Sequence, residues 1–371
     1  MTSAAEFDVA IAGGGIVGCA CALACAKRGL HVAIVEGNTW GSGATAAGMG
    51  HIVVMDDSEA QFALTRYSQQ LWNAMELPPA AEYVQTGTLW IAIDKEELEA
   101  AERKQAWYAR HGVPATMLTA SELYQAEKHL APGLAGALLI PEDSVIYPPV
   151  AALELANRAE ALGAKRFAGR TVNAMGAGRI ELESGETIRA TKLVLALGAE
   201  STRLAPHIAV RKRKGHLVIT DRYPGFVHHQ LVELGYLKSA HSLGSDSVAF
   251  NVQPRKTGQL LIGSSRQFDV EYPEVDHGIL TAMLKRAEIY LPGISELNAI
   301  RVWTGFRAAT PDKLPLIGPD TQDSTLLLAT GHEGLGITTS LATAEMIADL
   351  MTGQTTHIPL DPYLPSRTMA A

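Results

Sequence analysis

FDVAIAGGGIVGCACALACAKRGLHVAIVE, residues 7–36, is the stretch that decides the fold of this chain. An apolar run at 9–12 predicts a buried strand and leads into a G-x-G-x-x-G sequence at 13–18, after which a helix of small residues follows. A second apolar run, 31–35, ends at Glu36. A dinucleotide-binding unit requires this order of elements: a strand, a glycine turn, a helix, a second strand and an acid roughly twenty residues after the glycines.

Each glycine of this turn has a separate physical role. Gly13 permits the tight turn, Gly15 lets backbone N–H groups approach a pyrophosphate, and Gly18 lets the helix lie close to the strand. Glu36 can accept both hydroxyls of an adenosine ribose, and its charge would repel a 2′-phosphate, which argues against NADP. The alternative is a glycine-rich turn in an ordinary α/β domain. The nucleotide contacts expected here are Gly13, Gly15, Ile16, Val17, Gly18 and Glu36.

The composition favours a large folded core and excludes several classes of partner. The chain has 371 residues, 47% of them apolar, and a mean hydropathy of +0.06, which is enough for two intertwined domains. A formal charge of -8 and a pI near 5.9 leave no basic surface for nucleic acid. The basic run 211–214 is interpreted as a solvated strand start or loop, rather than as a nuclear signal or phosphate patch. No apolar stretch has the length of a membrane span and no signal-peptide pattern opens the chain, so we expect a cytoplasmic protein without an integral membrane segment.

All three cysteines, Cys19, Cys21 and Cys25, fall on the expected first helix. Cys21 and Cys25 share a helix face, but neither a C-x-x-C motif nor a fourth ligand accompanies them, so we expect no metal site. Small buried thiols that pack the helix against the sheet are the favoured interpretation.

The rest of the chain alternates between helix and strand patterns. A run of small residues at 42–49 is too poor in bulk for a core and would let the backbone press against something flat and large. Residues 138–149 are expected to form a turn-rich crossing segment. Helices are predicted at 58–75, at 95–111, from 119 or 121, and at 150–162, 278–291 and 334–351; strands are predicted at 87–93, 166–174, 179–183, 187–190, 192–198, 216–220, 247–254, 259–263, 300–306 and 326–330.

This order of elements indicates an α/β fold with an additional mixed β sheet. A Rossmann-like nucleotide-binding domain is expected to be discontinuous, because its pattern returns late in the chain. A second domain would bind the substrate on an antiparallel or mixed sheet. The expected segments are 1–80, 145–215 and 311–371 for the nucleotide-binding domain, and 81–144 and 216–310 for the substrate-binding domain.

Five segments of the chain form an ordered set. They are the opening unit 7–50, the strand 193–198, Gly305-Phe306-Arg307, LPLIG at 314–318 and GHEGLGI at 331–337. In this order they resemble the flavoenzymes of the D-amino-acid oxidase superfamily, most closely its glycine oxidase and sarcosine oxidase branch. The resemblance covers nearly the whole chain. It implies an FAD cofactor beneath a mixed sheet that bounds a site for a small amine.

The resemblance also implies how FAD is held. The loop 334–337, at a helix N-terminus, would place N–H groups near the flavin N1 and O2 edge, where negative charge gathers on reduction. Val172 would offer its backbone to the adenine, and the strand that ends at Gly198 would pass beside the nucleotide. No cysteine follows Cys25, so FAD is expected to be non-covalent. The further cofactor contacts expected are Ala46, Ala47, Gly48, Met49, Gly334, Leu335, Gly336 and Ile337.

Arg307 matches the arginine that pairs with the substrate carboxylate in these enzymes, and its planar fork suits that anion; the alternative is a salt bridge. Two positions depart from the glycine oxidases, which have a second arginine where this chain has Glu333 and a tyrosine where it has Phe250. Glu333 indicates either a substrate with an extra cationic or hydroxyl group or a structural hydrogen bond. His51 would face the flavin or substrate, or satisfy a buried turn, and His332 is interpreted as structural. The expected substrate contacts are Arg307, Met49, His51, Phe250 and Glu333, with Arg307, His51 and Glu333 as catalytic candidates.

The implied reaction is oxidation of a primary or secondary amine of an amino acid. The α-hydrogen would leave as hydride to flavin N5, and His51 or Glu333 would assist nitrogen deprotonation. A non-catalytic flavin-binding subunit is the alternative, and an NAD-dependent dehydrogenase is disfavoured by the late glycine loop and its helix. Segments 48–57 and 331–340 together look most like the catalytic beta subunits of bacterial D-hydroxyproline and opine dehydrogenases. Oxygen, a quinone or a partner subunit would accept the electrons, in a homo- or hetero-oligomer.

Overall fold

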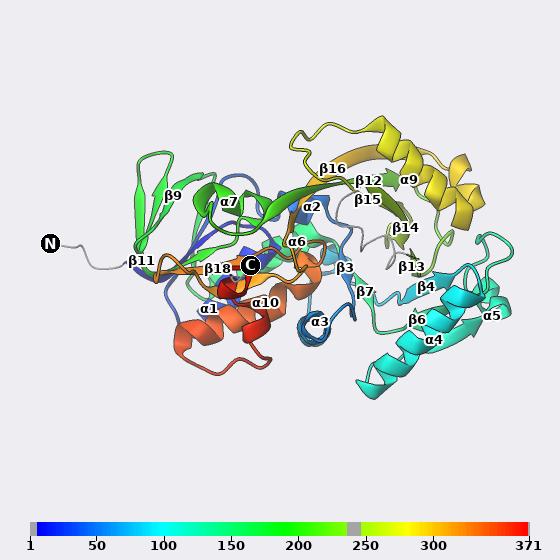
Figure 1. The fold of residues 1–371 in the computed structure, drawn as a ribbon. Coiled ribbons are helices and arrows are strands. Elements are labelled where there is room, and N and C mark those ends of the chain that lie inside the picture. Colours follow the sequence, from blue (N-terminus) through cyan, green and yellow to red (C-terminus); the bar gives the residue numbers. More distant parts are fainter. Residues whose placement is uncertain (1–5, 236–245, 370–371) are drawn as a thin grey trace. The chain divides into compact units, whose positions relative to one another are not determined.

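The computed structural model describes residues 6–235 and 246–369, and it divides into two compact units (Figure 1). Both units are discontinuous along the chain, with segments close to those expected for the nucleotide-binding and substrate-binding domains. The largest difference is at Phe306, where unit 1 resumes five residues before the expected residue 311. Arg307 therefore falls within unit 1. Unit 1 contains Met1–Ala81, Tyr147–Lys212 and Phe306–Ala371, and unit 2 contains Glu82–Ile146 and Arg213–Gly305.

The sheet of unit 1 is built around the first strand of the chain. In their order across the sheet, its strands are β17 (Leu316–Pro319), β18 (Leu326–Thr330), β11 (Thr187–Leu195), β1 (Phe7–Ala12), β2 (Val32–Glu36) and β8 (Lys165–Ala168). Neighbouring strands are parallel, except that β17 is antiparallel to β18. Ile11 on β1 is paired with both Ile34 on β2 and Val194 on β11. Because both faces of these central strands are covered, their sequences are nearly continuous apolar runs.

An antiparallel hairpin extends β11 beyond the parallel sheet. It consists of β9 (Val172–Gly176) and β10 (Arg179–Leu182), and β10 pairs with the first part of β11. The sequence predicts two strands, 187–190 and 192–198, whereas the structure has one continuous strand. The hydrophobic pattern of the sequence changes within this strand, which is why two strands were predicted. Side chains in its first part alternate between buried and exposed, whereas its last part is enclosed between β1 and β18 and is apolar throughout.

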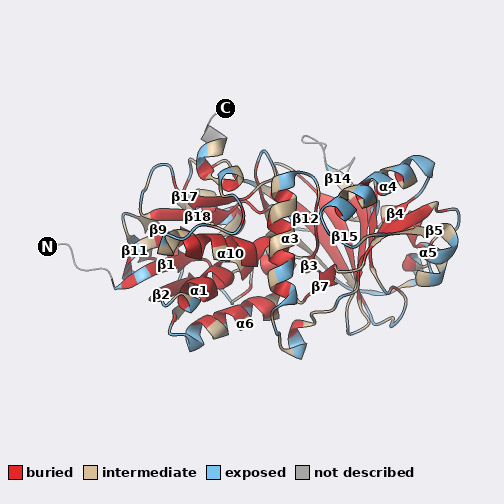
Figure 2. Cartoon of the chain, turned by 90° about the horizontal axis from the view of Figure 1, so that it is seen from below, coloured by how far each residue is buried: buried red, intermediate tan, exposed pale blue. Residues whose placement is uncertain are grey.

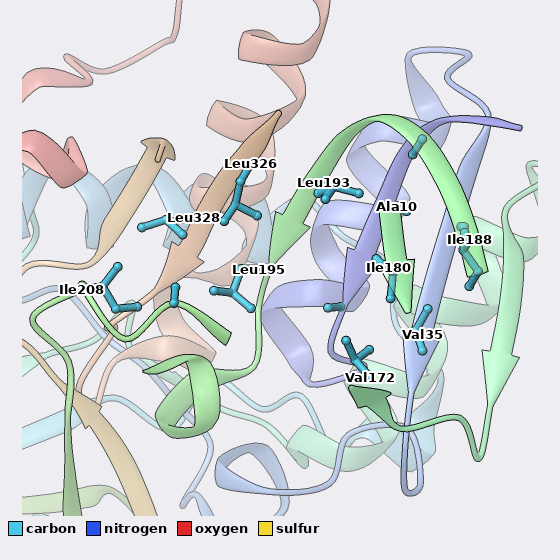
Figure 3. Close-up of a cluster of buried hydrophobic side chains, with 14 of the residues drawn as sticks. Ala10, Val35, Val172, Ile180, Ile188, Leu193, Leu195, Ile208, Leu326 and Leu328 are labelled. Atoms are coloured by element: carbon cyan, nitrogen blue, oxygen red, sulfur yellow. The ribbon is translucent and has the colours of Figure 1, made fainter. Parts of the chain in front are cut away.

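A hydrophobic core of unit 1 contains side chains from the parallel sheet and from this hairpin (Figure 3). Ala10, Val35 and Leu195 belong to strands β1, β2 and β11, and Val172 and Ile180 belong to the hairpin. All five side chains are buried. Since burial of a Val, Ile or Leu side chain contributes about 1.5–3 kcal/mol, this core holds the strand ends that lead into the glycine turn.

Helices α1 (Ile16–Lys27) and α10 (Gly336–Thr352) pack against each other, although they lie at opposite ends of the sequence. Figure 2 shows that both helices are largely buried. The cysteines of α1 are buried and form no disulfide, which confirms that they are small packing residues. The other helices of unit 1 are α2 (Ala44–Ala47), α3 (Glu59–Asn73), α6 (Pro148–Ala161) and α7 (Ser201–Leu204), and a short strand, β3, covers His51–Ile52.

A second sheet, mainly antiparallel, belongs largely to unit 2. In their order across the sheet, its strands are β16 (Ala299–Ala309), β12 (Arg211–Thr220), β15 (Leu260–Arg266), β14 (Ser247–Pro254), β13 (Gln230–Glu233), β4 (Thr88–Ala92), β6 (Gly136–Ile140) and β5 (Thr116–Thr119). The first residues of β12 and the last residues of β16 fall in unit 1. Strands β13 and β4 are parallel. The sequence missed β5 and β13, which have four residues each, and the single strand predicted at 166–174 is two strands, β8 and β9, in the structure. The crossing segment predicted from residue 138 was wrong at its start because β6 continues to Ile140. The remaining elements are α4 (Lys95–Arg110), α5 (Ala120–Ala126), α9 (His277–Tyr290) and β7 (Ser144–Val145).

The basic run 211–214 opens β12, as predicted, but the prediction that it is solvated was wrong for its second half. Arg213 and Lys214 are buried. The Lys214 ammonium lies 4.2 Å from the centre of the Tyr272 ring, and the Arg213 guanidinium lies 4.7 Å from the centre of the Phe268 ring. The Lys214 ammonium also donates to the carbonyl of Glu274 at 2.5 Å, so an aromatic face and a carbonyl oxygen stabilise its charge, and the Phe268 ring face stabilises that of Arg213. Within the described part of the chain, no helix has both the length and the apolar character needed to cross a membrane.

A buried carboxylate connects the unit 2 sheet to α9. Glu233 on β13 accepts hydrogen bonds from the backbone N–H of Phe250, at 2.6 Å, and from the hydroxyl of Tyr290, at 3.0 Å. It also forms an ion pair with Arg286 of α9. Burial, and then the neighbouring Glu233 charge, raise the pKa of Tyr290 well above its usual range. Glu233 therefore satisfies several groups of the sheet and the helix at once.

We predict that Glu233→Ala lowers the free energy of unfolding of unit 2 by about 2–4 kcal/mol, because it leaves buried donors and a partly buried cation without an acceptor. The measurement is urea-induced unfolding followed by far-UV circular dichroism. Glu99→Ala is the control, because the Glu99 pair with Lys95 also lies in unit 2, is exposed and should contribute under about 1 kcal/mol. Equal shifts for the two variants would contradict a special role for Glu233.

Candidate functional site

The turn between β1 and α1 brings backbone segments closer than a side chain permits. Gly13 has φ +113°, in the region that favours glycine, and a Cβ added there would lie 2.4 Å from the carbonyl oxygen of Ala196. A Cβ added to Gly18 would lie 1.9 Å from the carbonyl oxygen of Gly13. Both distances are far inside van der Waals contact, so these two positions accept only glycine. The result is a helix that starts directly against the ends of β1 and β11.

The N-terminus of α1 is open. Its N-cap residue, Gly15, has no side chain, and only the N–H of Ile16 finds a side-chain acceptor, Oγ1 of Thr45 at 3.0 Å. Within residues 6–235 and 246–369, the N–H groups of Val17 and Gly18 have no acceptor. An uncapped first turn carries partial positive charge and favours an anion such as a pyrophosphate. Thr45 was missed by sequence reasoning, since nothing but its hydroxyl distinguishes it within the small-residue run 42–49.

Glu36 is buried and points back toward this turn. Its Oε2 accepts a hydrogen bond from Gly14 N at 2.7 Å and its Oε1 accepts one from Asn38 N at 2.6 Å. Because each carboxylate oxygen has two acceptor positions, both oxygens keep one for a ribose hydroxyl. Val172, the expected adenine contact, has its carbonyl oxygen bonded to Arg203 at 2.7 Å. A contact with adenine would therefore use the Val172 N–H or share this carbonyl.

A second open helix N-terminus belongs to α10. No side chain caps it, and for the N–H groups of Gly336, Ile337 and Thr338 the described chain provides no acceptor. A Cβ added to Gly48 would lie 2.6 Å from Cδ1 of Ile337. The hydroxyl of Thr338 donates to the carbonyl of His51 at 2.7 Å. The structure thus brings together the two groups of expected flavin contacts, 46–49 and 334–337.

Arg307 lies beside the loop that leads into α10. The N–H of Glu333 donates to the carbonyl of Ala308 at 2.8 Å, which joins this loop to β16. A Cβ added to Gly334 would lie 3.6 Å from Nε of Arg307. Glu333 has φ +52°, a left-handed conformation that costs a non-glycine residue about 1–2 kcal/mol. Backbone strain of this kind is typical of functional loops. In this loop the strained residue, Glu333, and Gly334 lie next to Arg307.

The two histidines expected near the site differ in their hydrogen bonds. Nε2 of His332 lies 3.0 Å from Oγ1 of Thr343, which ties the loop to α10. Nε2 of His51 is buried and has no hydrogen-bond partner among the residues that are described. Burial lowers the pKa of His51 to about 4 and that of His332 to about 3, so both are neutral at pH 7. His51 therefore offers an unused ring nitrogen, whereas His332 has a structural contact.

The other expected residues are placed differently. Met49 is buried in unit 1, and the carbonyl of Gly198 accepts a hydrogen bond from Thr330 at 3.0 Å. Phe250 is fully buried in the core of unit 2, where its ring stacks on Tyr290 at a centroid distance of 4.4 Å. The expectation that Phe250 faces a substrate is therefore corrected, because its side chain points into the core between the sheet and α9.

These features fit FAD. The open N-terminus of α1 and Glu36 suit the pyrophosphate and ribose, and the open N-terminus of α10 suits an edge of the flavin that gains negative charge. The orphaned N–H groups are the observation that requires an acceptor from outside the chain. In the described ranges, no group of three or more His, Cys, Asp or Glu side chains is arranged to hold a metal ion.

Comparisons with known proteins agree with this site. The family model of the DAO family, described as FAD dependent oxidoreductase, matches residues 8–350. The chain is 29% identical to glycine oxidase of Geobacillus kaustophilus, over 96% of each protein. The crystal structure of that enzyme matches with a TM-score of 0.85 and 28% identity, and covers 97% of this chain and 98% of its own.

Two further relatives extend the comparison. Hydrogen cyanide synthase subunit HcnC of Pseudomonas aeruginosa is 25% identical over 97% of this chain and 96% of its own. L-proline dehydrogenase from P. horikoshii has the same fold, with a TM-score of 0.89 at 24% identity, and the match covers 99% of each chain. Since the family model spans most of the sequence, the chain belongs to the DAO family and is an FAD-dependent oxidoreductase.

Proposed function

We propose that this enzyme oxidises the C–N bond of a small amino acid with a primary or secondary amine. The observation that carries the proposal is the position of Arg307 beside Gly334, in contact with the loop that precedes α10. Two relatives are named for glycine and L-proline, compounds with both an amine and a carboxylate, which supports this substrate class. Candidate substrates are glycine, N-substituted glycines, D-amino acids, D-hydroxyproline and opines.

Each participant has a defined part in the reaction. The Arg307 guanidinium binds the substrate carboxylate through two hydrogen bonds and so fixes the orientation of the α-carbon. When bound, FAD supplies at N5 the acceptor for the α-hydrogen and both electrons of the C–H bond. The nitrogen loses a proton and its lone pair forms the C=N bond. The resulting imine hydrolyses to a keto acid or remains cyclic.

His51 is proposed to accept a hydrogen bond from the substrate nitrogen. Its pKa of about 4 makes it a weak proton acceptor. The ammonium group of a free amino acid is a much weaker acid than protonated His51, and each unit of pKa difference costs about 1.4 kcal/mol, so moving a proton from the substrate to His51 is strongly unfavourable. The amine is therefore bound in its neutral form, and His51 Nε2 orients the N–H rather than removing the proton of an ammonium group.

Glu333 is proposed to contact the substrate from the loop beside Arg307. Its backbone bond to Ala308 and its left-handed conformation fix the base of the side chain next to the arginine. A carboxylate there favours a substrate with a second cationic or hydroxyl group, whereas glycine has neither. We therefore rank substituted amino acids above glycine itself.

A polar sheet face supports the proposal that unit 2 is the substrate domain. Leu231 belongs to the core beside α9, so its neighbours Gln230 and Val232 point to the opposite face. There Gln230 is paired with Thr88, and Val232 with Asn251. Thr88 Oγ1, Gln230 Oε1 and Asn251 Oδ1 are buried and find no hydrogen-bond partner in the described chain. Buried oxygens without a hydrogen-bond partner are rare in a native core, so these three are available to the polar groups of a ligand.

The cofactor is proposed to be non-covalent, because the cysteines are confined to α1 and are buried. The electrons are proposed to pass to oxygen, a quinone or a partner subunit. The relative HcnC is named as a subunit, which supports a partner and hence a hetero-oligomer. We further propose that the protein acts in the cytoplasm.

Glu36→Gln should weaken FAD binding about tenfold to a hundredfold, because a neutral amide replaces a charged acceptor of ribose hydroxyls. The measurement is titration of the apoprotein with FAD, followed by quenching of flavin fluorescence. FMN lacks the adenosine ribose, so its affinity should change less than threefold. An unchanged FAD affinity would remove Glu36 from the nucleotide site.

Arg307→Ala should lower kcat/KM for the best amino-acid substrate about a hundredfold, since truncating one partner of such a pair typically costs about 2–5 kcal/mol. For the matching amine without a carboxylate, the variant and the wild type should differ little. Arg301→Ala, an exposed arginine on the same strand, is the matched control. Equal losses with both kinds of substrate would refute the carboxylate contact.

His51→Gln should slow flavin reduction about tenfold and leave its pH dependence unchanged. With a pKa of about 4, His51 is already neutral above about pH 5, so the rate should rise with pH only as the substrate amine loses its proton. Stopped-flow absorbance between pH 5 and 9 provides the test, with the exposed His277→Gln as control. If the rate of flavin reduction in the His51 variant no longer shows a change with pH that the wild type shows, this histidine is the base.

A further inference from the structure

Trp72 of α3 contacts the first turn of α10. Its side chain is fully buried, and its indole N–H is shared between the carbonyls of Ile337, at 3.3 Å, and Thr338, at 3.2 Å. These carbonyls lie one turn from the open end of the helix, where the N–H groups have no acceptor in the described chain. The donor comes from a different helix, so this contact is not part of the helix's own hydrogen bonding.

The geometry of the peptide bond transmits this contact to the open end. The carbonyl of Ile337 and the N–H of Thr338 belong to one planar peptide group and point in opposite directions. A donor that holds the carbonyl therefore also fixes the direction of the N–H. It also polarises the group, because hydrogen bonds in a chain strengthen one another by about 10–30%. The Thr338 N–H becomes a better aimed and stronger donor.

Two further contacts hold the first two turns of α10. Ser68, one turn before Trp72 on α3, accepts a hydrogen bond from the N–H of Ala342 at 3.2 Å. The Thr338 hydroxyl donates to the carbonyl of His51 at 2.7 Å. Ser68 and Thr338 are both buried. The first turn of α10 is thus fixed from α3 on one side and from β3 on another, as a preorganised donor site requires.

We propose that Trp72 is a positioning residue for the flavin: through the Ile337–Thr338 peptide it directs an N–H group at the edge that becomes negative on reduction. The inference rests on the proposed contact between α10 and the flavin, but not on the identity of the substrate. The oxidised flavin has no full charge at this edge. Trp72 therefore favours the reduced form over the oxidised form.

Trp72→Phe tests this proposal, because it removes the donor and keeps most of the ring. We expect the preference for reduced over oxidised flavin to fall about threefold to tenfold, which makes the reduction potential about 15–30 mV more negative for a two-electron couple. The affinity for oxidised FAD should change less than twofold. The potential is measured against a reference dye during anaerobic chemical reduction, without any amino acid, so failure of the substrate assignment does not affect it.

Tyr363→Phe is the matched control, since it removes a 2.6 Å hydrogen bond from the Tyr363 hydroxyl to the carbonyl of Ala60, at the other end of α3. Its potential should equal that of the wild type. An unchanged potential in Trp72→Phe would overturn the proposal, as would equal weakening of oxidised and reduced FAD, which indicates only general loosening. Thr338→Val separates two reasons for failure. This variant keeps the backbone N–H and removes the hydroxyl that donates to His51, so a shift in it alone assigns the orientation of the turn to the His51 contact, and no shift in either variant shows that neither contact sets the potential.

Discussion

The site depends on the close backbone approach at Gly13 and Gly18. Where a Cβ would lie 1.9–2.4 Å from a carbonyl oxygen, no other residue fits, and α1 is thereby pressed against the ends of β1 and β11. This contact leaves the first turn of α1 uncapped and open to an anion. It also sets the position of α10, which packs along α1. Two helix N-termini of unit 1 are open, and the described chain provides no acceptor for N–H groups at either of them, where a bound FAD would supply one.

The residues around the second N-terminus come from distant parts of the chain. The loop before α10 is joined to β16 through Ala308 and Glu333, and the first turn of α10 is joined to β3 through Thr338 and to α3 through Trp72. The contact between Ala308 and Glu333 also places Arg307, the residue before Ala308 on β16, next to Gly334. A single short loop thus supports both the expected flavin contact and the expected carboxylate contact. This coupling explains why the loop retains a strained residue at Glu333.

Sequence reasoning succeeded where the determining contacts are local. The glycine turn and Glu36 lie within one strand–helix–strand unit, so spacing alone was enough to predict them. The prediction for Phe250 was wrong because the sequence of a buried strand does not show which of its two faces packs against a core. In the structure the ring of Phe250 packs against Tyr290 of α9. Thr45 and Trp72 gave no signal, since their partners are far away in sequence. Lys214 was expected in solvent because its aromatic partner, Tyr272, is equally remote.

The central claim is that a small amino acid reduces the flavin of this protein. The most direct measurement is anaerobic mixing of the FAD-loaded protein with glycine, sarcosine, D-proline, D-hydroxyproline and opines, with flavin absorbance recorded during the reaction. We expect at least one of these compounds to bleach the flavin, and readmitted air then shows whether oxygen accepts the electrons. If dithionite bleaches the flavin and no amino acid does, oxidation of the C–N bond is contradicted.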